Sequence, residues 1–235
     1  VNLYLGKNAG LDATGGYDNI AIGQSAGQSM STGHDNILIG KNAGLSSSHE
    51  SNNYNVAIGE NALGLGTGAN FHNNIALGQL AGYNQQSSYG TFIGRWSGQK
   101  GGGYLNTCVG VMSGFNLVGS NQKNTLIGGW AGSSITGAEG TINVAIGHFA
   151  MLNLNDGTGN TGIGDFTLRG INDGDYNVGI GFQAGYNLKD HQDNVFIGGR
   201  TARSGAGDTI ITGGNYNSII GAYGAYDITT GYSNS

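Results

Sequence analysis

The sequence has no proline, a single cysteine and few charged residues, which make up only 10% of its 235 residues. With one cysteine, Cys108, no intramolecular disulfide can form, and a small apolar position or a reactive thiol remain its two possible roles. The formal net charge is -5, so the basic surface typical of nucleic-acid binding is absent. No apolar run approaches the roughly 20 residues of a membrane-spanning helix. We therefore expect no nucleic-acid partner and no membrane insertion.

Glycine, in contrast, is abundant, with 48 copies. The glycines follow no three-residue period, which excludes a collagen triple helix. So much glycine would favour disorder, except that the apolar residues fall in step with a longer repeat. The sequence therefore predicts an ordered repeat protein.

The repeat is clearest in Asn143–Ala150, where Asn is followed by three apolar residues and then Gly. We number each repeat from its Asn slot as position 0, and position +4 is Gly in every copy. Spacings between slots are 16 to 19 residues, and 23 before the last. A fixed period of this size predicts a solenoid. The thirteen slots are Asn2, Asn19, Asn36, Asn55, Asn74, Gly90, Asn106, Asn124, Asn143, Asn160, Asn177, Asn194 and Asn217.

Three residues after each slot form a predicted strand. Position +1 is mostly β-branched and position +3 is always Ile, Leu or Val, so both are expected inside the coil. Alternation places position +2 on the other side, yet that column is apolar as well. We expect it to be covered by identical chains in a homotrimer. The predicted trimer seam is Ala21, Leu38, Ala57, Ala76, Phe92, Leu126, Ala145 and Phe196.

The remaining positions have simpler interpretations. The Asn side chains are expected to hydrogen-bond from coil to coil, and the Gly at +4 to allow a bend or a close backbone approach. Position +5 is mostly polar and is expected to face solvent, whereas position +7 is small and suits an inner corner. No residue type in this pattern points to a bound cofactor.

Aromatic residues gather at position +6 in the middle and late copies. An exposed row there would suit stacking on sugars, and possible receptor contacts are Trp96, Trp130, Phe149 and Tyr223. In the alternative, these rings thicken the seam, because +6 shares parity with +2. The sequence leaves both open and favours the seam.

The regular repeats define one region, residues 1–198, with no interior domain boundary. Residues 199–235 are less regular: Thr209, Ile210 and Ile211 form a strand-like run without the full motif, and a Tyr-rich end follows. We expect irregular last coils that form a cap or a junction to a following domain, in a chain that is part of a longer protein.

Segments such as Asn55–Gly59 and Asn143–Gly147 resemble the heads of YadA-like trimeric autotransporter adhesins and similar repeats in phage tail fibres. The resemblance implies an all-β, parallel β-solenoid of about 13 coils, a left-handed β-roll, assembled as a homotrimer. It also implies attachment to a host surface glycan or outer-membrane receptor, and an extracellular location on a virion or a bacterial surface. The Asn- and Gly-rich composition and the tyrosines favour the tail fibre.

The enzyme alternative is a tailspike-like polysaccharide depolymerase, which needs two carboxylates in a cleft. Asp173 and Asp175 lie close in sequence, as do Asp190 and Asp193, but both pairs fall in turns where Asp is common. The five histidines show no metal-ligand spacing. We expect no enzyme activity, catalytic residue, metal or cofactor. Ice binding through a threonine ladder is a further alternative, disfavoured because Thr recurs only at +1, which we assign to the interior.

Overall fold

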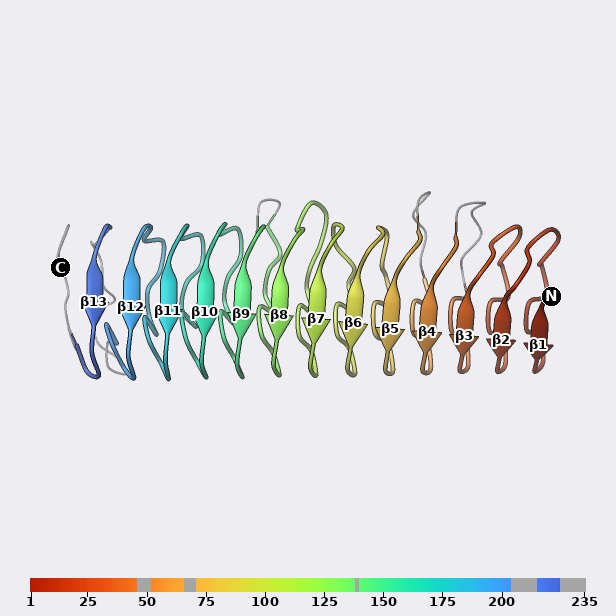
Figure 1. The fold of residues 1–235 in the computed structure, drawn as a ribbon, viewed down its shortest axis with the longest axis horizontal. Helices are drawn as coiled ribbons and strands as arrows, with labels where there is room; N and C mark the ends of the chain where they lie inside the picture. The colour runs from red at the N-terminus through yellow and green to blue at the C-terminus, as the bar shows by residue number, and fades with distance from the viewer. Residues whose placement is uncertain (46–51, 66–70, 138–139, 204–214, 225–235) are drawn as a thin grey trace. The chain divides into compact units, whose positions relative to one another are not determined.

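The computed structural model describes residues 1–45, 52–65, 71–137, 140–203 and 215–224. Within these ranges the regular secondary structure consists of thirteen three-residue strands, each starting at position +1 of a repeat (Figure 1). The strands are β1 (Leu3–Leu5), β2 (Ile20–Ile22), β3 (Ile37–Ile39), β4 (Val56–Ile58), β5 (Ile75–Leu77), β6 (Thr91–Ile93), β7 (Thr107–Val109), β8 (Thr125–Ile127), β9 (Val144–Ile146), β10 (Thr161–Ile163), β11 (Val178–Ile180), β12 (Val195–Ile197) and β13 (Ser218–Ile220).

The chain divides into two compact units, Val1–Gly119 and Ser120–Ser235. The first contains β1 to β7 and the second β8 to β13. Within each unit, every strand pairs in parallel with the next one along the chain, and equivalent repeat positions are aligned, as in Ile20 with Ile37. The predicted all-β, parallel β-solenoid is therefore confirmed, with one strand for each repeat and about 11 turns where the sequence predicted about 13 coils.

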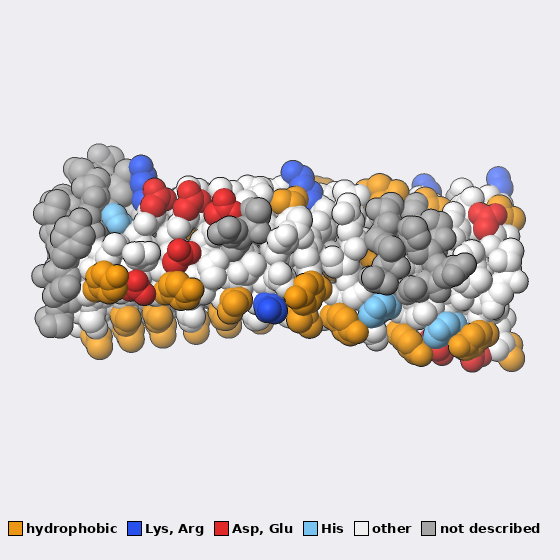
Figure 2. Space-filling view, turned by 90° about the horizontal axis from the view of Figure 1, so that it is seen from above, with side chains coloured by type: hydrophobic (Ala, Val, Ile, Leu, Met, Phe, Trp, Pro, Cys, Tyr) orange, Lys and Arg blue, Asp and Glu red, His pale blue; other side chains and the backbone are white. Residues whose placement is uncertain are grey.

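The side assignment made from the sequence is wrong. The middle residue of the strand, position +2, points into its own coil: Ala57, Phe92 and Leu126 are each 0% exposed. None of the first or third strand residues is buried, and Ile75 and Ile163 are 41% and 38% exposed. Hydrophobic side chains accordingly line one edge of the Ser120–Ser235 unit in Figure 2.

The eight residues predicted to form a seam between chains are instead fully or almost fully buried within one chain. A three-residue strand can send only one side chain inward when its middle residue faces the interior. Both sides of the strand are apolar, so hydrophobicity did not identify the inner one. The interior residues concerned are Ala21, Leu38, Ala57, Ala76, Phe92, Leu126, Ala145 and Phe196.

Residue sizes in the interior are matched between positions +2 and +8. Where +2 is Leu38, the Cβ of a residue replacing Gly44 at +8 would lie 2.8 Å from the Leu38 side chain. Where +2 is Gly162, the space is taken by Met151, which occupies +8 of the preceding coil. At these positions a large residue at +2 or +8 thus faces a glycine in the same or the next coil.

A further interior column lies at position +11 and was not predicted from the sequence. These side chains are at most 1% exposed and complete the core on the return half of the coil. They come after a turn, so alternation from the strand does not reach them. The column consists of Met30, Leu117, Ile135, Leu154, Ile171 and Leu188.

The glycine at +4 is required for two reasons. Its φ lies between 125° and 136° in every coil, a region accessible essentially only to glycine. A Cβ at Gly147 would also lie 2.4 Å from the carbonyl oxygen of Gly164 in the next coil. Position +6 then adopts a left-handed conformation, as at Trp96 with φ 60°, so strand alternation ends at the glycine.

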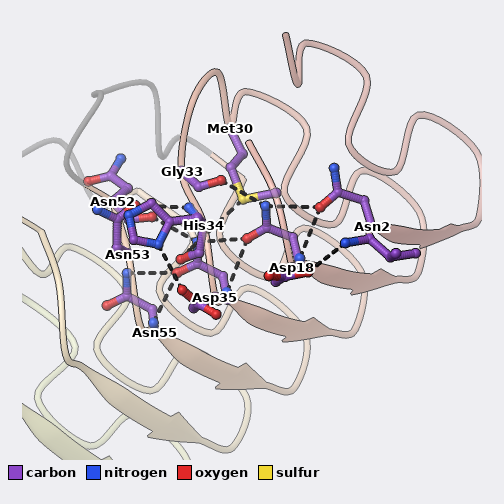
Figure 3. A network of polar contacts seen from close by, with 12 residues as sticks. Asn2, Asp18, Met30, Gly33, His34, Asp35, Asn52, Asn53 and Asn55 are labelled. Carbon is purple, nitrogen blue, oxygen red and sulfur yellow. Dashed lines mark hydrogen bonds and ion pairs between the residues drawn. The ribbon is translucent and has the colours of Figure 1, made fainter. Parts of the chain in front are cut away.

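The predicted asparagine ladder is confirmed (Figure 3). The Oδ1 of Asn19 accepts hydrogen bonds from the backbone N and the Nδ2 of Asn36, both at 3.0 Å. The Nδ2 of Asn19 donates to the carbonyl of Gly33 at 2.7 Å and to Oδ1 of Asn2 at 3.4 Å. One amide therefore uses two acceptor and two donor sites, a combination that the carboxylate of Asp cannot provide.

Candidate interaction surfaces

The outer strand face consists of the first and third residues of each strand. In the Val1–Gly119 unit its exposed members include Ile37, Ile58, Ile75 and Ile93. Ile127, Ile163, Ile180 and Ile220 are exposed in the same way in the Ser120–Ser235 unit. Within each unit, aliphatic side chains repeated in register from strand to strand form a contiguous apolar surface, which is unusual for a soluble monomer.

A second exposed column precedes the Asn slot. Tyr54, Tyr89, Tyr176 and Tyr216 occupy this position with φ between 54° and 63°, and each is more than half exposed. The left-handed backbone directs the side chain away from the coil just before the strand begins. These rings add apolar area with a polar hydroxyl at the tip, a combination enriched at protein interfaces.

Position +6 carries a row of rings in the Ser120–Ser235 unit. The ring centroids of Trp130 and Phe149 are 6.1 Å apart, and those of Phe149 and Phe166 are 5.2 Å apart. Phe166 in turn lies 6.4 Å from Tyr186, whose hydroxyl accepts a hydrogen bond from Arg169. The rings pack against their neighbours from coil to coil and are only partly exposed.

The parity argument that placed these rings in a seam does not hold. Position +6 is separated from position +2 by the sharp turn at glycine, so the two columns face different directions. Of the predicted receptor contacts, Trp130 is 37% exposed and Tyr223 is 58% exposed, whereas Trp96 and Phe149 are partly buried. The structure places Trp96 in one unit and the other three in the second. Their role in receptor binding stays a prediction.

An open hollow of about 310 Å³ lies in the Val1–Gly119 unit. Its lining consists of three residues at position +6 of successive coils, Leu80, Trp96 and Met112, with Gln99 and Phe115 from position +9. Two cations border it, because the Arg95 guanidinium lies 3.8 Å from the Trp96 ring centroid and Lys100 Nζ lies 5.9 Å from that of Phe115. Sequence analysis identified Trp96 but not the hollow around it.

One residue of each acidic pair considered for catalysis holds the backbone of the neighbouring coil. Asp175 Oδ1 accepts a hydrogen bond from the backbone N of Thr158 at 2.7 Å, and Asp190 Oδ1 accepts one from that of Asp173 at 3.4 Å. These contacts fit the turn role that the sequence offered as an alternative. The part of the chain that the structure describes contains no group of three or more potential metal ligands.

Cys108 occupies position +2 of β7 and is 0% exposed. Burial removes the thiolate from water, which raises the pKa of the Cys108 thiol far above its ordinary value. Of its two possible roles, the small buried apolar residue is the one that fits, because an unreactive thiol is poorly suited to chemistry at neutral pH.

Among the described residues, no helix is long and apolar enough to cross a membrane. Comparison of the sequence with protein-family models and with curated proteins, and of the fold with solved structures, finds no match.

Proposed function

We propose that this chain is a structural and adhesive segment of a homotrimeric fibre. Three left-handed β-rolls surround a common axis and bury their outer strand faces against one another. The observation that supports this assembly is the column of Ile, Val, Leu and Thr at positions +1 and +3, whose side chains are exposed or only half-buried in the single chain. The number of chains and the handedness come from the resemblance to trimeric adhesin heads.

An identical chain is the partner that fits the outer strand face best. The face repeats the same residue types once per coil, so a second copy in parallel register meets the same pattern along its length. Closed rotational symmetry then leaves no outer face unpaired. None of the thirteen strands contains a charged residue, which also favours burial of the outer strand face.

The mechanism we propose is mechanical. Backbone pairing from strand to strand makes each unit stiff, so that binding surfaces are held away from the particle, and three copies bind a host cell surface multivalently. A phage tail fibre is our first assignment, with a surface glycan or outer-membrane receptor as partner and an extracellular location. The head of a bacterial autotransporter adhesin is the alternative with the same assembly, and a membrane barrel in the adjoining sequence would distinguish it.

The assembly is tested by the native mass and by a matched pair of variants. Three chains of 24.0 kDa give a trimer of about 72 kDa. Ile93→Lys places a charge on the outer strand face, whereas Val111→Lys places the same charge at position +5, where Val111 is 50% exposed. We expect sedimentation to show a trimer for the wild type and Val111→Lys, and loss of the trimer for Ile93→Lys. A monomeric wild type would refute the assembly.

The attachment is tested separately with fluorescently labelled protein on candidate host cells. We expect the trimer to bind at least about 100-fold better than the Ile93→Lys monomer, because three linked sites bind with avidity. Equal binding by trimer and monomer would show that attachment does not depend on the fibre. Hydrolysis of capsular polysaccharide by the purified chain would instead favour the depolymerase.

A further inference from the structure

The hollow in the Val1–Gly119 unit has a floor that spans three coils. Leu80, Trp96 and Met112 lie at the same repeat position after β5, β6 and β7, so the floor extends over about 10 Å. The left-handed conformation at this position occurs in every coil and is a property of the fold, not of the hollow. What distinguishes these coils is the set of side chains, which are apolar except for Gln99.

Trp96 supplies an aromatic stacking surface on the lining of the hollow. Its Nε1 is buried and out of reach of solvent, so a ligand in the hollow meets the ring of Trp96 and not its N–H. Gln99, on the same lining, offers an amide that can both donate and accept. The hollow therefore suits a ligand with an apolar face and several hydroxyl groups.

The charge around the hollow is positive in an otherwise acidic chain. Residues 61–119 contain Arg95 and Lys100 but no Asp or Glu, whereas the whole chain has a net charge of -5. Arg95 Nε donates to Gln79 Oε1 at 3.2 Å, which fixes the guanidinium over Trp96 and leaves its other N–H groups for a ligand. The nearest acid in this network is Glu60, which accepts a hydrogen bond from Gln79 at 3.1 Å.

We propose that this hollow binds a carboxylated sugar residue of an acidic surface glycan, a refinement that rests on the proposed attachment function. The apolar face of the sugar ring stacks on Trp96, its hydroxyl groups bond with Gln99, and Arg95 binds the carboxylate. Bidentate binding of a carboxylate is what a guanidinium does best. Three copies in a fibre would present three such sites to one glycan layer.

The test uses two probes that differ only in the acidic group, methyl glucuronide and methyl glucoside. Titrations followed by saturation-transfer NMR on the intact chain should show glucuronide binding about tenfold tighter, the difference expected for one charge-assisted hydrogen bond. Trp96→Ala should abolish binding of both probes. Arg95→Gln should reduce the affinity for glucuronide to that for glucoside and leave the affinity for glucoside unchanged.

Phe182→Ala is the matched control, because Phe182 is an exposed ring in the other unit, remote from the hollow in sequence. It should bind both probes like the wild type. If Trp96→Ala does not fold, Trp96→Phe keeps a smaller ring with less stacking area and should weaken binding of both probes. Equal affinity for the two probes, no binding at high millimolar concentration, or unchanged binding by a folded Trp96 variant would overturn the proposal.

Measurement of the native mass in the same samples separates this proposal from the fibre assembly. A trimeric chain that binds neither probe refutes the sugar site and leaves the fibre intact. A monomeric chain that binds glucuronide through Trp96 and Arg95 refutes the trimer and leaves the sugar site intact.

Discussion

The inner and outer sides of the three-residue strands differ in how much the sizes of their side chains vary. On the inner side, sizes range from Gly162 to Phe196, and each large residue is matched by a small one in the same or the next coil. On the outer side, the residues are nearly uniform, with Ile, Val, Leu or Thr in almost every coil. Size matching is what a closed core requires, whereas uniformity is what association with an identical neighbour requires. The inner side thus specifies the coil and the outer side, we infer, specifies the assembly.

The largest expected effect comes from the glycine that ends the strand. Gly198 has φ 134°, and a Cβ there would lie 2.6 Å from the backbone of Gly221, whereas Gly199 has open space around it. Gly198→Ala should destabilise the chain by about 4 to 6 kcal/mol, from backbone strain and from a clash that stacked coils cannot relieve. Gly199→Ala should change the stability by less than about 1 kcal/mol. Chemical denaturation followed by circular dichroism measures both, and similar losses would show that the stack tolerates side chains there.

The asparagine ladder is the next most sensitive part of the interior. Asn160→Asp keeps the shape of the side chain but replaces the amide that donates to Gly174 O at 2.7 Å and to Asn143 Oδ1 at 3.1 Å. Two buried acceptors each lose one hydrogen bond and a charge is buried, so we expect a loss of about 3 to 5 kcal/mol.

The matched control for the ladder is Asn172→Asp, since Asn172 is exposed and outside the ladder. It should change the free energy of unfolding by less than about 0.5 kcal/mol. Equal effects of the two substitutions would show that added charge, and not the loss of ladder hydrogen bonds, causes the destabilisation.

Substitutions of two adjacent residues in β8 allow a direct comparison of the two sides of the strand. Leu126 is 0% exposed and Ile127 is 37% exposed in the single chain. Leu126→Ala should cost about 2 to 4 kcal/mol through the cavity that it leaves. Ile127→Ala should cost less than about 1 kcal/mol in the monomer.

Unfolding at several protein concentrations separates the effects of these two substitutions further. Association adds stability that depends on concentration, so removal of an interface residue should make the midpoint of unfolding more sensitive to dilution. We expect this behaviour for Ile127→Ala and not for Leu126→Ala. A dilution effect of the same size in both variants would contradict the division into an inner and an outer side.

The smallest effect is a change in chemical reactivity without a change in stability. Burial raises the pKa of the Cys108 thiol, so thiolate is scarce below that pKa and alkylation at pH 8 should be slow until the chain unfolds. In a Cys108→Ala background, Val109→Cys places a thiol on the outer side of the same strand. It should react quickly in a monomer and slowly in an assembled fibre. Rapid labelling of native Cys108 would contradict its burial.

Much of the fold could be predicted from the sequence because the repeat is nearly exact at the Asn slot and at Gly +4. These two positions located all thirteen strands, and the ladder and the close approach of glycines followed from the chemistry of the two residues. The inner side was assigned wrongly because both sides are apolar. The complementary sizes of Gly162 and Met151 could have identified the inner side, since only interior residues need to match in size.

The candidate sites were less predictable than the fold. Trp96 was identified as an aromatic residue at position +6, but its neighbours Gln99 and Phe115 come from two coils and lie beyond a left-handed turn. The contact between these three side chains depends on how successive coils pack, which cannot be predicted from the sequence of a single repeat. The column at +11 was missed for the same reason, because Leu154 and Ile171 are separated from their strands by turns.

The ladder has a consequence for how such a chain can change during evolution. Every slot except Gly90 carries Asn, so most coils present the same amide oxygen to the next coil and need an amide in return, as Asn143, Asn160 and Asn177 do in succession. Deletion or duplication of one whole coil therefore leaves the new neighbours with compatible edges. Recombination between Asn-bearing repeats could lengthen or shorten the protein in steps of about 4.8 Å while the hydrogen bonds of the ladder are restored.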